Sequence, residues 1–266
     1  MKQLAALLGL SLLWPAAALA CGPDTNCDIE DGFYLIRMPE GVSEGDKPGA
    51  ILFAHGYRGS AKGTMNNQSL QNLAQDLGVA LIAIKSSAED WTIANSPQEG
   101  RVRQRDEVAY AARVVDDAVA RFGLDPERIL ATGFSAGGMM TWTLACHDSD
   151  RYVGFAPLAG TFWAPEPQSC DTPPANIIHY HGTEDNMVPL AGRPIAQTKQ
   201  GDVGKVLDMY ASFGGYQTVV ETVPLDGLTC QARENPEGKL LEICTFTGGH
   251  SFKADYIRRA WAAFAG

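Results

Sequence analysis

The chain has 266 residues, of which 45% are hydrophobic and 20% are charged, and its formal net charge is −10. This balance is typical of a globular domain with a sizeable core, and it excludes a disordered or fibrous chain. The acidic excess makes nucleic acids and anionic membranes poor partners, so we expect neither.

The N-terminal segment has the pattern of a secretory signal peptide. A positive charge at Lys2 precedes an apolar run over residues 4–14, and Ala18-Leu19-Ala20 is a small-x-small cleavage site. The run is too short to span a bilayer comfortably. We therefore expect residues 1–20 to be removed and residues 21–266 to form a single domain with no membrane span, in the periplasm or outside the cell.

Two alternatives remain open for this segment. The apolar run also fits a buried N-terminal strand or helix, and Cys21 fits the lipidated first residue of a lipoprotein. A lipoprotein signal usually has Leu three residues before the cysteine, where this chain has Ala18. We therefore favour an unlipidated, exported chain.

Strand-like and helical segments alternate along the rest of the sequence. Short apolar runs of the kind that suits buried parallel strands occupy residues 50–54, 79–84, 128–132, 152–158 and 177–180. Helix patterns occupy residues 69–77, 106–122, 136–146, 203–213 and 254–265. The alternation predicts an α/β fold with a mostly parallel central sheet and helices on both faces. No intervening stretch is long enough for a large lid domain, so we expect a fairly open active site.

A serine motif lies between the third predicted strand and the third predicted helix. Residues 133–137 read Gly-Phe-Ser-Ala-Gly, the G-x-S-x-G pattern of a nucleophile elbow. Small residues flank such a serine because the turn is tight, and the helix that follows directs free backbone N–H groups toward developing negative charge. The alternative is a glycine-rich turn with an incidental serine. The strand before the motif and the helix after it favour Ser135 as the nucleophile of an α/β-hydrolase fold.

A serine nucleophile requires a base and an acid that orients the base. In the α/β-hydrolase fold these follow in the order Ser, acid, His. His250 is preceded by two glycines near the C-terminus, whereas His179 and His181 belong to a predicted strand and its end. We therefore expect His250 to be the base. Asp185 lies in the loop after that strand, where the acid belongs, and we favour it over its neighbour Glu184.

Two backbone N–H groups should stabilise the oxyanion of such an enzyme. One is that of Ala136, directly after the serine, and we expect the other from Tyr57 in the loop after the first predicted strand. His55, in the same loop, should be structural. Trp91 and Trp163 are candidates for a substrate pocket, with core or surface aromatic residues as the alternative.

Six cysteines in an exported chain predict disulfides, although six allow about fifteen pairings. Proximity in the sequence favours a disulfide between the first two cysteines, and a turn-rich hairpin favours one between the last two. The two cysteines in the middle of the chain are then left to pair with each other. The expected pairs are Cys21 with Cys27, Cys230 with Cys244, and Cys146 with Cys170. Metal binding is the competing interpretation, but no Cys/His spacing typical of zinc occurs. We expect no metal and no cofactor.

Four phrases resemble the polyhydroxybutyrate depolymerase and feruloyl esterase-like family of α/β-hydrolases. They are HGYRGSA (55–61), GFSAGGMM (133–140), HGTEDNMVP (181–189) and GGHSF (248–252). The resemblance covers nearly all of the chain after the signal peptide and keeps the order of the family's motifs.

The resemblance implies catalytic roles for Ser135, Asp185 and His250, and an oxyanion-hole N–H at Tyr57. Members of that family also tend to pair a Cys on the helix after the serine with a Cys before the strand that leads to the Asp, which supports Cys146–Cys170. The chain departs from the family at Tyr57, where members often have Cys, and in the residues that precede Trp91, where a tryptophan-rich stretch is common.

These observations predict a serine esterase that hydrolyses carboxylic esters through an acyl-enzyme. Hydroxyalkanoate oligomers, esters of the polyhydroxybutyrate type and short-chain esters are the first expectation for the substrate, as a small ester, an oligoester or a polyester surface. Feruloyl or acetyl esters and aromatic polyesters are the alternatives. A non-catalytic binding protein on a hydrolase scaffold is a remote alternative, because such a protein usually lacks a triad member.

Overall fold

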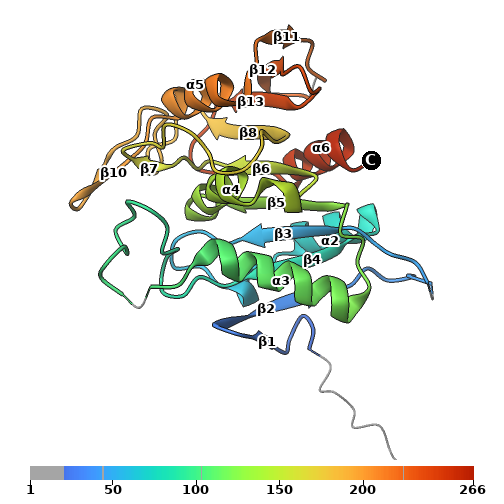
Figure 1. The fold of residues 1–266 in the computed structure, drawn as a ribbon. Helices are drawn as coiled ribbons and strands as arrows, with labels where there is room; N and C mark the ends of the chain where they lie inside the picture. Colours follow the sequence, from blue (N-terminus) through green and yellow to red (C-terminus); the bar gives the residue numbers. More distant parts are fainter. Residues whose placement is uncertain (1–20, 44, 103, 224) are drawn as a thin grey trace, which may run out of the picture.

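The computed structural model describes residues 21–43, 45–102, 104–223 and 225–266. The expected signal peptide at residues 1–20 lies outside the described residues. The described chain is organised around a ten-stranded sheet, with a second sheet of three short strands beside it (Figure 1). No large lid covers the sheet in this part of the chain, as expected.

The order of strands in the main sheet is β1-β2-β4-β3-β5-β6-β8-β13-β12-β11. The strands from β4 to β13 in this order run parallel, and antiparallel strands flank them at both edges. The bounds are β1 (Cys27–Ile29), β2 (Gly32–Arg37), β3 (Ala50–Ala54), β4 (Ala80–Ile84), β5 (Ile129–Phe134), β6 (Gly154–Leu158), β8 (Ile177–Gly182), β11 (Thr218–Val220), β12 (Thr229–Glu234) and β13 (Leu240–Phe246). The five apolar runs of the sequence are therefore β3, β4, β5, β6 and β8, and the prediction of a mostly parallel sheet is confirmed.

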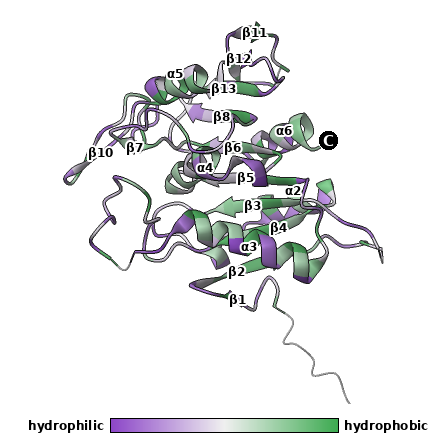
Figure 2. Cartoon of the chain, in the orientation of Figure 1, coloured by the Kyte–Doolittle hydropathy of each residue, from purple (hydrophilic) through white to green (hydrophobic). Residues whose placement is uncertain are grey.

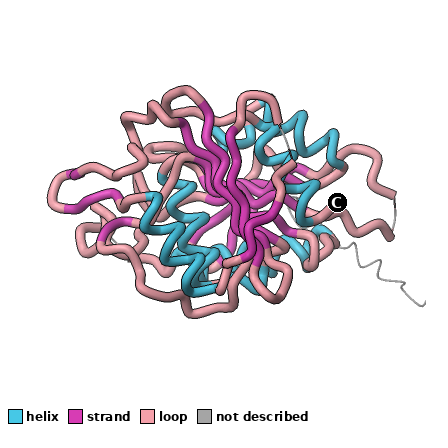
Figure 3. The backbone as a smooth tube through the Cα atoms, turned by 90° about the horizontal axis from the view of Figure 1, so that it is seen from above, coloured by secondary structure: helices cyan, strands magenta, loops and turns pink. Residues whose placement is uncertain are grey.

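Helices cover both faces of this sheet, which appears as a twisted band between them when seen from above (Figure 3). One face packs against α3 (Glu107–Phe122), α4 (Ala136–His147) and α5 (Val203–Gly214), and the other against α1 (Ala61–Met65), α2 (Gln68–Leu77) and α6 (Ala254–Phe264). The second sheet consists of β7 (Trp163–Ala164), β9 (Pro194–Ile195) and β10 (Thr198–Gln200).

The central strands are apolar at every position because both of their faces are buried. In β3 the side chains of Ala50, Leu52 and Ala54 enter the core on one face, and those of Ile51 and Phe53 enter the core on the other. Hydrophobic residues accordingly dominate β3, whereas α3 mixes hydrophobic and hydrophilic segments (Figure 2). The backbone N–H and C=O groups of a strand with two buried faces find hydrogen-bond partners only in the neighbouring strands. Because these neighbours run parallel, their carboxyl ends lie along one edge of the sheet.

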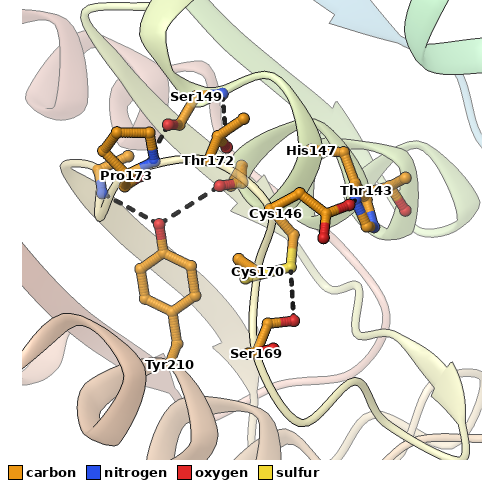
Figure 4. Close-up of a disulfide and its surroundings, with 12 residues drawn as sticks. Thr143, Cys146, His147, Ser149, Ser169, Cys170, Thr172, Pro173 and Tyr210 are labelled. Atoms are coloured by element: carbon orange, nitrogen blue, oxygen red, sulfur yellow. Dashed lines mark hydrogen bonds and ion pairs between the residues drawn. A yellow bond between two sulfur atoms is a disulfide. The ribbon is translucent and has the colours of Figure 1, made fainter.

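All six cysteines form disulfides in the pairs expected, Cys21–Cys27, Cys146–Cys170 and Cys230–Cys244. The first of them leaves no thiol on Cys21 for attachment of a lipid. The second joins the end of α4 to the segment that leads into β8 (Figure 4). Beside it, the Tyr210 hydroxyl of α5 accepts the Ala175 N–H (3.0 Å), so that α5 and the segment before β8 are held together.

Among the described helices, none is both long and apolar enough to cross a membrane.

Candidate active site

Ser135 occupies a sharp turn between β5 and α4. Its backbone has φ 61° and ψ −119°, a conformation that residues other than glycine rarely adopt and that recurs at functional sites. The Ser135 N–H donates to the Leu158 carbonyl (2.9 Å), and the Met139 N–H donates to the Ser135 carbonyl (3.0 Å). Ser135 therefore stands directly before the first turn of α4, whose leading N–H groups have no partner within the helix.

The glycines of the motif are required by close approaches between backbones. A Cβ atom on Gly137 would lie 1.9 Å from the carbonyl oxygen of Ala54, and one on Gly133 would lie 2.4 Å from the carbonyl oxygen of Gly137. The end of β3 and the start of α4 thus pack with no side chain between them. This contact sets how close the loop after β3 comes to Ser135.

Replacing Gly137 with Ala should lower the free energy of unfolding by about 3 kcal/mol, because the added methyl group meets backbone that cannot move aside. Urea denaturation measures the change. Gly22→Ala is the control, since a Cβ there meets no atom within 4 Å, and its expected change is below about 0.5 kcal/mol. A Gly137→Ala protein as stable as the wild type would contradict the packing described above.

The adjacent parallel strands β8 and β13 bring Asp185 and His250 together. His250 Nδ1 lies 2.6 Å from Asp185 Oδ2. Asp185 is buried, and its Oδ1 accepts the N–H groups of Met187 and Val188, each at 2.8 Å. Glu184 is exposed and has no side-chain hydrogen bond to His250 among the described residues. The geometry therefore couples His250 to Asp185, the residue favoured from the sequence.

This coupling fixes the state of the imidazole. Nδ1 must carry the proton that it donates to the Asp185 carboxylate, so Nε2 of the neutral ring is left as an acceptor. The ring packs against Phe134, the residue before Ser135, at a centroid distance of 4.6 Å. The imidazole thus lies beside the turn that holds Ser135.

The loop after β3 packs against the same turn. A Cβ on Gly56 would lie 3.3 Å from the Phe134 carbonyl oxygen, so the backbone that leads into Tyr57 runs alongside the turn. His55 holds this loop, because its Nδ1–H donates to the Gly56 carbonyl (2.8 Å) and its Nε2 accepts the Ser86 N–H (3.2 Å). The structure thus gives His55 the supporting place expected for it.

Trp91 does not line a substrate pocket, contrary to the expectation from the sequence. Its side chain is fully buried, its Nε1–H donates to the His55 carbonyl (2.9 Å), and its ring packs on the His55 ring at a centroid distance of 5.0 Å. The chain turns inward after β4, so Trp91 lies beneath the loop that presents Tyr57. Its contacts support that loop and leave no surface for a ligand.

A cavity of about 280 Å³ opens at Ser135. Trp163, one of the two tryptophans proposed for a substrate pocket, lines this cavity, and β7 carries it opposite Gln200 of β10. The cavity is therefore walled partly by the second sheet, which the sequence did not predict. Its lining consists of Tyr57, Asp90, Pro97, Gln98, Ser135, Ala136, Met139, Trp163, Met187, Val188, Arg193, Ile195 and Gln200.

Two charged residues of this cavity, Asp90 and Arg193, were not predicted from the sequence. Burial raises the pKa of Asp90 to about 6, because the charged form is poorly solvated, while its hydrogen bond from the Trp91 N–H acts in the other direction. Arg193 is half-buried, and its Nε–H donates to the Met187 carbonyl (2.9 Å). Neither stands in a recognisable motif, so only their positions in the fold reveal them.

A chain of buried rings lies behind Asp185. The Trp142 Nε1–H donates to His179 Nδ1 (3.2 Å), which requires His179 to donate through Nε2 to His181 Nδ1 (2.9 Å). His181 Nε2 then donates to the Val188 carbonyl at 2.7 Å and lies 3.6 Å from Asp185 Oδ2. Burial lowers the pKa of His179 well below its usual range and also lowers that of His181. Both rings are therefore neutral supports of the Asp185 loop.

Buried neutral histidines predict that the protein loses stability in mild acid. Burial lowers the pKa of His55 to about 4, and the pKa values of His179 and His181 are also lowered. The unfolded chain takes up these protons as the pH falls below about 6.5, whereas the folded chain does not, so the free energy of unfolding decreases from that pH downward. Asp90 opposes the three histidines, because its raised pKa lets the folded chain bind a proton first.

Urea denaturation at pH 7.5 and pH 5 measures the net effect. We expect a lower free energy of unfolding at pH 5, and a smaller difference between the two pH values in His55→Gln. A wild-type protein equally stable at both pH values would argue against three buried neutral imidazoles.

Comparison with known proteins places the chain in a family. Residues 42–210 match the family model described as phospholipase/carboxylesterase. The chain is 32% identical over 235 residues to the putative esterase NocK of Nocardia uniformis subsp. tsuyamanensis, covering 81% of this chain and 67% of that protein. It is 24% identical to feruloyl esterase B of Piromyces equi, covering 83% of this chain and 42% of that protein.

The chain is also similar to a depolymerase in part of its sequence and to a solved esterase in its fold. A 58-residue stretch is 38% identical to poly(3-hydroxyalkanoate) depolymerase C of Paucimonas lemoignei, covering 22% of this chain and 14% of that protein. The fold is similar to that of the acetyl xylan esterase from Aspergillus awamori, with a TM-score of 0.59 at 16% identity, covering 88% of this chain and 94% of that one. The resemblance drawn from the motifs is thus confirmed at the level of an esterase-like α/β-hydrolase family. The chain belongs to the phospholipase/carboxylesterase family of α/β-hydrolases, and it is an ester hydrolase.

Proposed function

We propose that the protein is an exported serine esterase with Ser135 as nucleophile, His250 as general base and Asp185 as the acid that orients it. The observation that carries the proposal is the 2.6 Å pair between Asp185 Oδ2 and His250 Nδ1, set beside the strained turn of Ser135. That pairing leaves His250 Nε2 as the proton acceptor that a serine hydroxyl requires. The three disulfides support export, since such bonds persist in oxidising compartments.

The reaction proceeds in two halves. Ser135 Oγ attacks the ester carbonyl as its proton passes to His250 Nε2, and the backbone N–H groups of Tyr57 and Ala136 bind the oxyanion. His250 then gives this proton to the alkoxide as the C–O bond breaks, which releases the alcohol and leaves the acyl group on Ser135. Water, deprotonated by His250, attacks the acyl-enzyme; the acid leaves, and the proton returns to Ser135.

The cavity supports small esters as the substrate class. Its volume of about 280 Å³ lies just below the usual range of ligand pockets, and Met139, Trp163 and Ile195 contribute apolar lining. Esters of short hydroxyalkanoate units and short aliphatic esters come first. Feruloyl and acetyl esters come second, supported by the likeness to a feruloyl esterase, and aromatic polyesters come third. If the protein hydrolysed no ester and did not react at Ser135, it would be a non-catalytic binding protein.

A covalent probe tests the proposal. A serine-directed organophosphate should abolish hydrolysis of p-nitrophenyl butyrate, and mass spectrometry should find one adduct, on the peptide that contains Ser135. Rates on soluble hydroxybutyrate oligomers, methyl ferulate and p-nitrophenyl acetate then rank the substrate classes. A folded protein that neither hydrolyses these esters nor reacts at Ser135 would be a binding protein.

A further inference from the structure

The cavity at Ser135 carries opposite charges on its two sides. Asp90 follows β4, whereas Arg193 lies in the connection between β8 and β9, directly before β9. In the sheet, β3 and β5 lie between β4 and β8, and Ser135 follows β5. The turn of Ser135 therefore stands between an acidic side and a basic side of one small cavity.

Arg193 is held in place without being neutralised. Its Nε–H donates to the Met187 carbonyl at 2.9 Å, and within the described part of the chain no carboxylate lies within 4.0 Å of its guanidinium. Arg58, Arg105 and Arg259 each have such a partner. The remaining N–H groups of a guanidinium form a planar fork that matches a carboxylate. A positioned, unpaired arginine in a cavity of a chain with net charge −10 indicates an anionic group on the ligand.

The side on which Arg193 lies identifies the part of the ester that carries this group. His250, which protonates the departing alkoxide in the proposed function, follows β13, and β13 pairs with β8. The alcohol component of the ester must therefore lie toward β8, where Arg193 also lies. An alcohol that bears a carboxylate is a hydroxy acid.

We infer that the cavity selects short linear esters whose alcohol component ends in a free carboxylate, and that Arg193 binds this carboxylate. The substrate class is the carboxyl-terminal end of a hydroxy-acid oligoester. Hydrolysis of its last ester bond consumes one water and releases one hydroxy acid and the shortened chain. The inference rests on the proposed function and adds the charged group that sets the direction of binding.

Asp90 on the opposite side enforces that direction. It is 6% exposed and lines the cavity, so at pH 8 its carboxylate repels a second carboxylate and accepts a hydrogen bond from a hydroxyl group. A hydroxy-acid unit in the acyl position offers a hydroxyl group there. An ester with a carboxylate on its acyl side is disfavoured.

Two contacts between distant loops hold the part of the cavity wall that contains residues 97–98. The Asn95 side-chain amide donates to the Pro165 carbonyl (3.2 Å), and Arg101 donates to the Gln197 side chain (2.9 Å). These bonds flank residues 97–98 of the cavity wall and tie them toward the second sheet. A held wall and a volume of about 280 Å³ favour a chain end over the middle of a polymer.

The experiment compares a linear 3-hydroxybutyrate dimer with the same dimer whose carboxylate is converted to a primary amide, at pH 8. The wild type should hydrolyse the acid with a kcat/KM at least ten-fold higher than the amide, mainly through KM. Arg193→Gln should bring this ratio close to one, because the acid and the amide are compared within the same variant and any general change in activity cancels. Arg193→Lys, which keeps the charge and loses the fork, should retain part of the preference.

Lys199→Gln is the matched control, because it removes one exposed cation from β10 without touching the cavity. It should leave the acid-to-amide ratio unchanged. Asp90→Asn should raise the rate on p-nitrophenyl hydrogen succinate, whose carboxylate is on the acyl side, relative to p-nitrophenyl butyrate. The inference is overturned if the acid-to-amide ratio of kcat/KM is near one in the wild type, or if Lys199→Gln lowers this ratio as much as Arg193→Gln does. Neither result would contradict the proposed esterase activity. A wild type inactive on every ester, p-nitrophenyl butyrate included, overturns the proposed function as well.

Discussion

Replacing Ser135 with alanine should lower kcat/KM for p-nitrophenyl butyrate by about 10⁴- to 10⁶-fold, the loss typical of a serine nucleophile. The substitution removes only Oγ. The Cβ atom that Ser135 already carries at φ 61° remains, so the strain of the turn is unchanged. The midpoint temperature of thermal unfolding should accordingly change by no more than about one degree.

The control for this prediction is Ser251→Ala, an exposed serine directly after His250. It should keep at least half of the wild-type rate. If Ser135→Ala retained a tenth of the activity in a protein cleared of contaminating esterases, another group would have to be the nucleophile.

Replacing Asp185 with asparagine should lower kcat by about 10³- to 10⁴-fold. Oδ1 of the amide can still accept the Met187 and Val188 N–H groups, so the loop should keep its shape. The amide NH₂ would then face His250 Nδ1, which would have to become an acceptor. Nε2 would carry the proton and could no longer take one from Ser135.

Steady-state kinetics at pH 8 measure this loss, and Glu184→Gln is the matched control. Glu184 is exposed, one residue away and of the same charge, and its replacement should change the rate by less than two-fold. A larger loss in Glu184→Gln than in Asp185→Asn would move the role of the acid to the neighbouring residue.

The parts of the fold that the sequence predicted are those with strong local patterns. The strands β3, β4 and β5 are unbroken apolar runs, and the turn around Ser135 has glycines that only a close backbone approach explains. The N-terminal strands β1 and β2 and the second sheet escaped prediction. Strands of two or three residues, such as β7 and β10, are too short to show a period, and they exist only because distant segments pair.

The cavity was harder to predict than the pairing of Asp185 with His250, for the same physical reason. Ser135, Asp185 and His250 each lie in a motif with a fixed place in the chain. Trp91 was misplaced because an aromatic residue after a strand fits a pocket and a core equally well until the path of its loop is known. Arg193 and Asp90 carry no local signal, and only the pairing of segments far apart in the sequence brings them to one cavity.

The position of β13 determines the stage of folding at which His250 reaches Asp185. Among the described strands β13 comes last in the sequence, yet it is inserted between β8 and β12 in the sheet, and His250 follows it. A nascent chain that has folded only as far as α5 contains Ser135 and Asp185 but lacks His250, the base of the proposed function. Because such long-range pairings form slowly, the pair of Asp185 and His250 is completed only when the C-terminal part of the described chain has docked, late in folding.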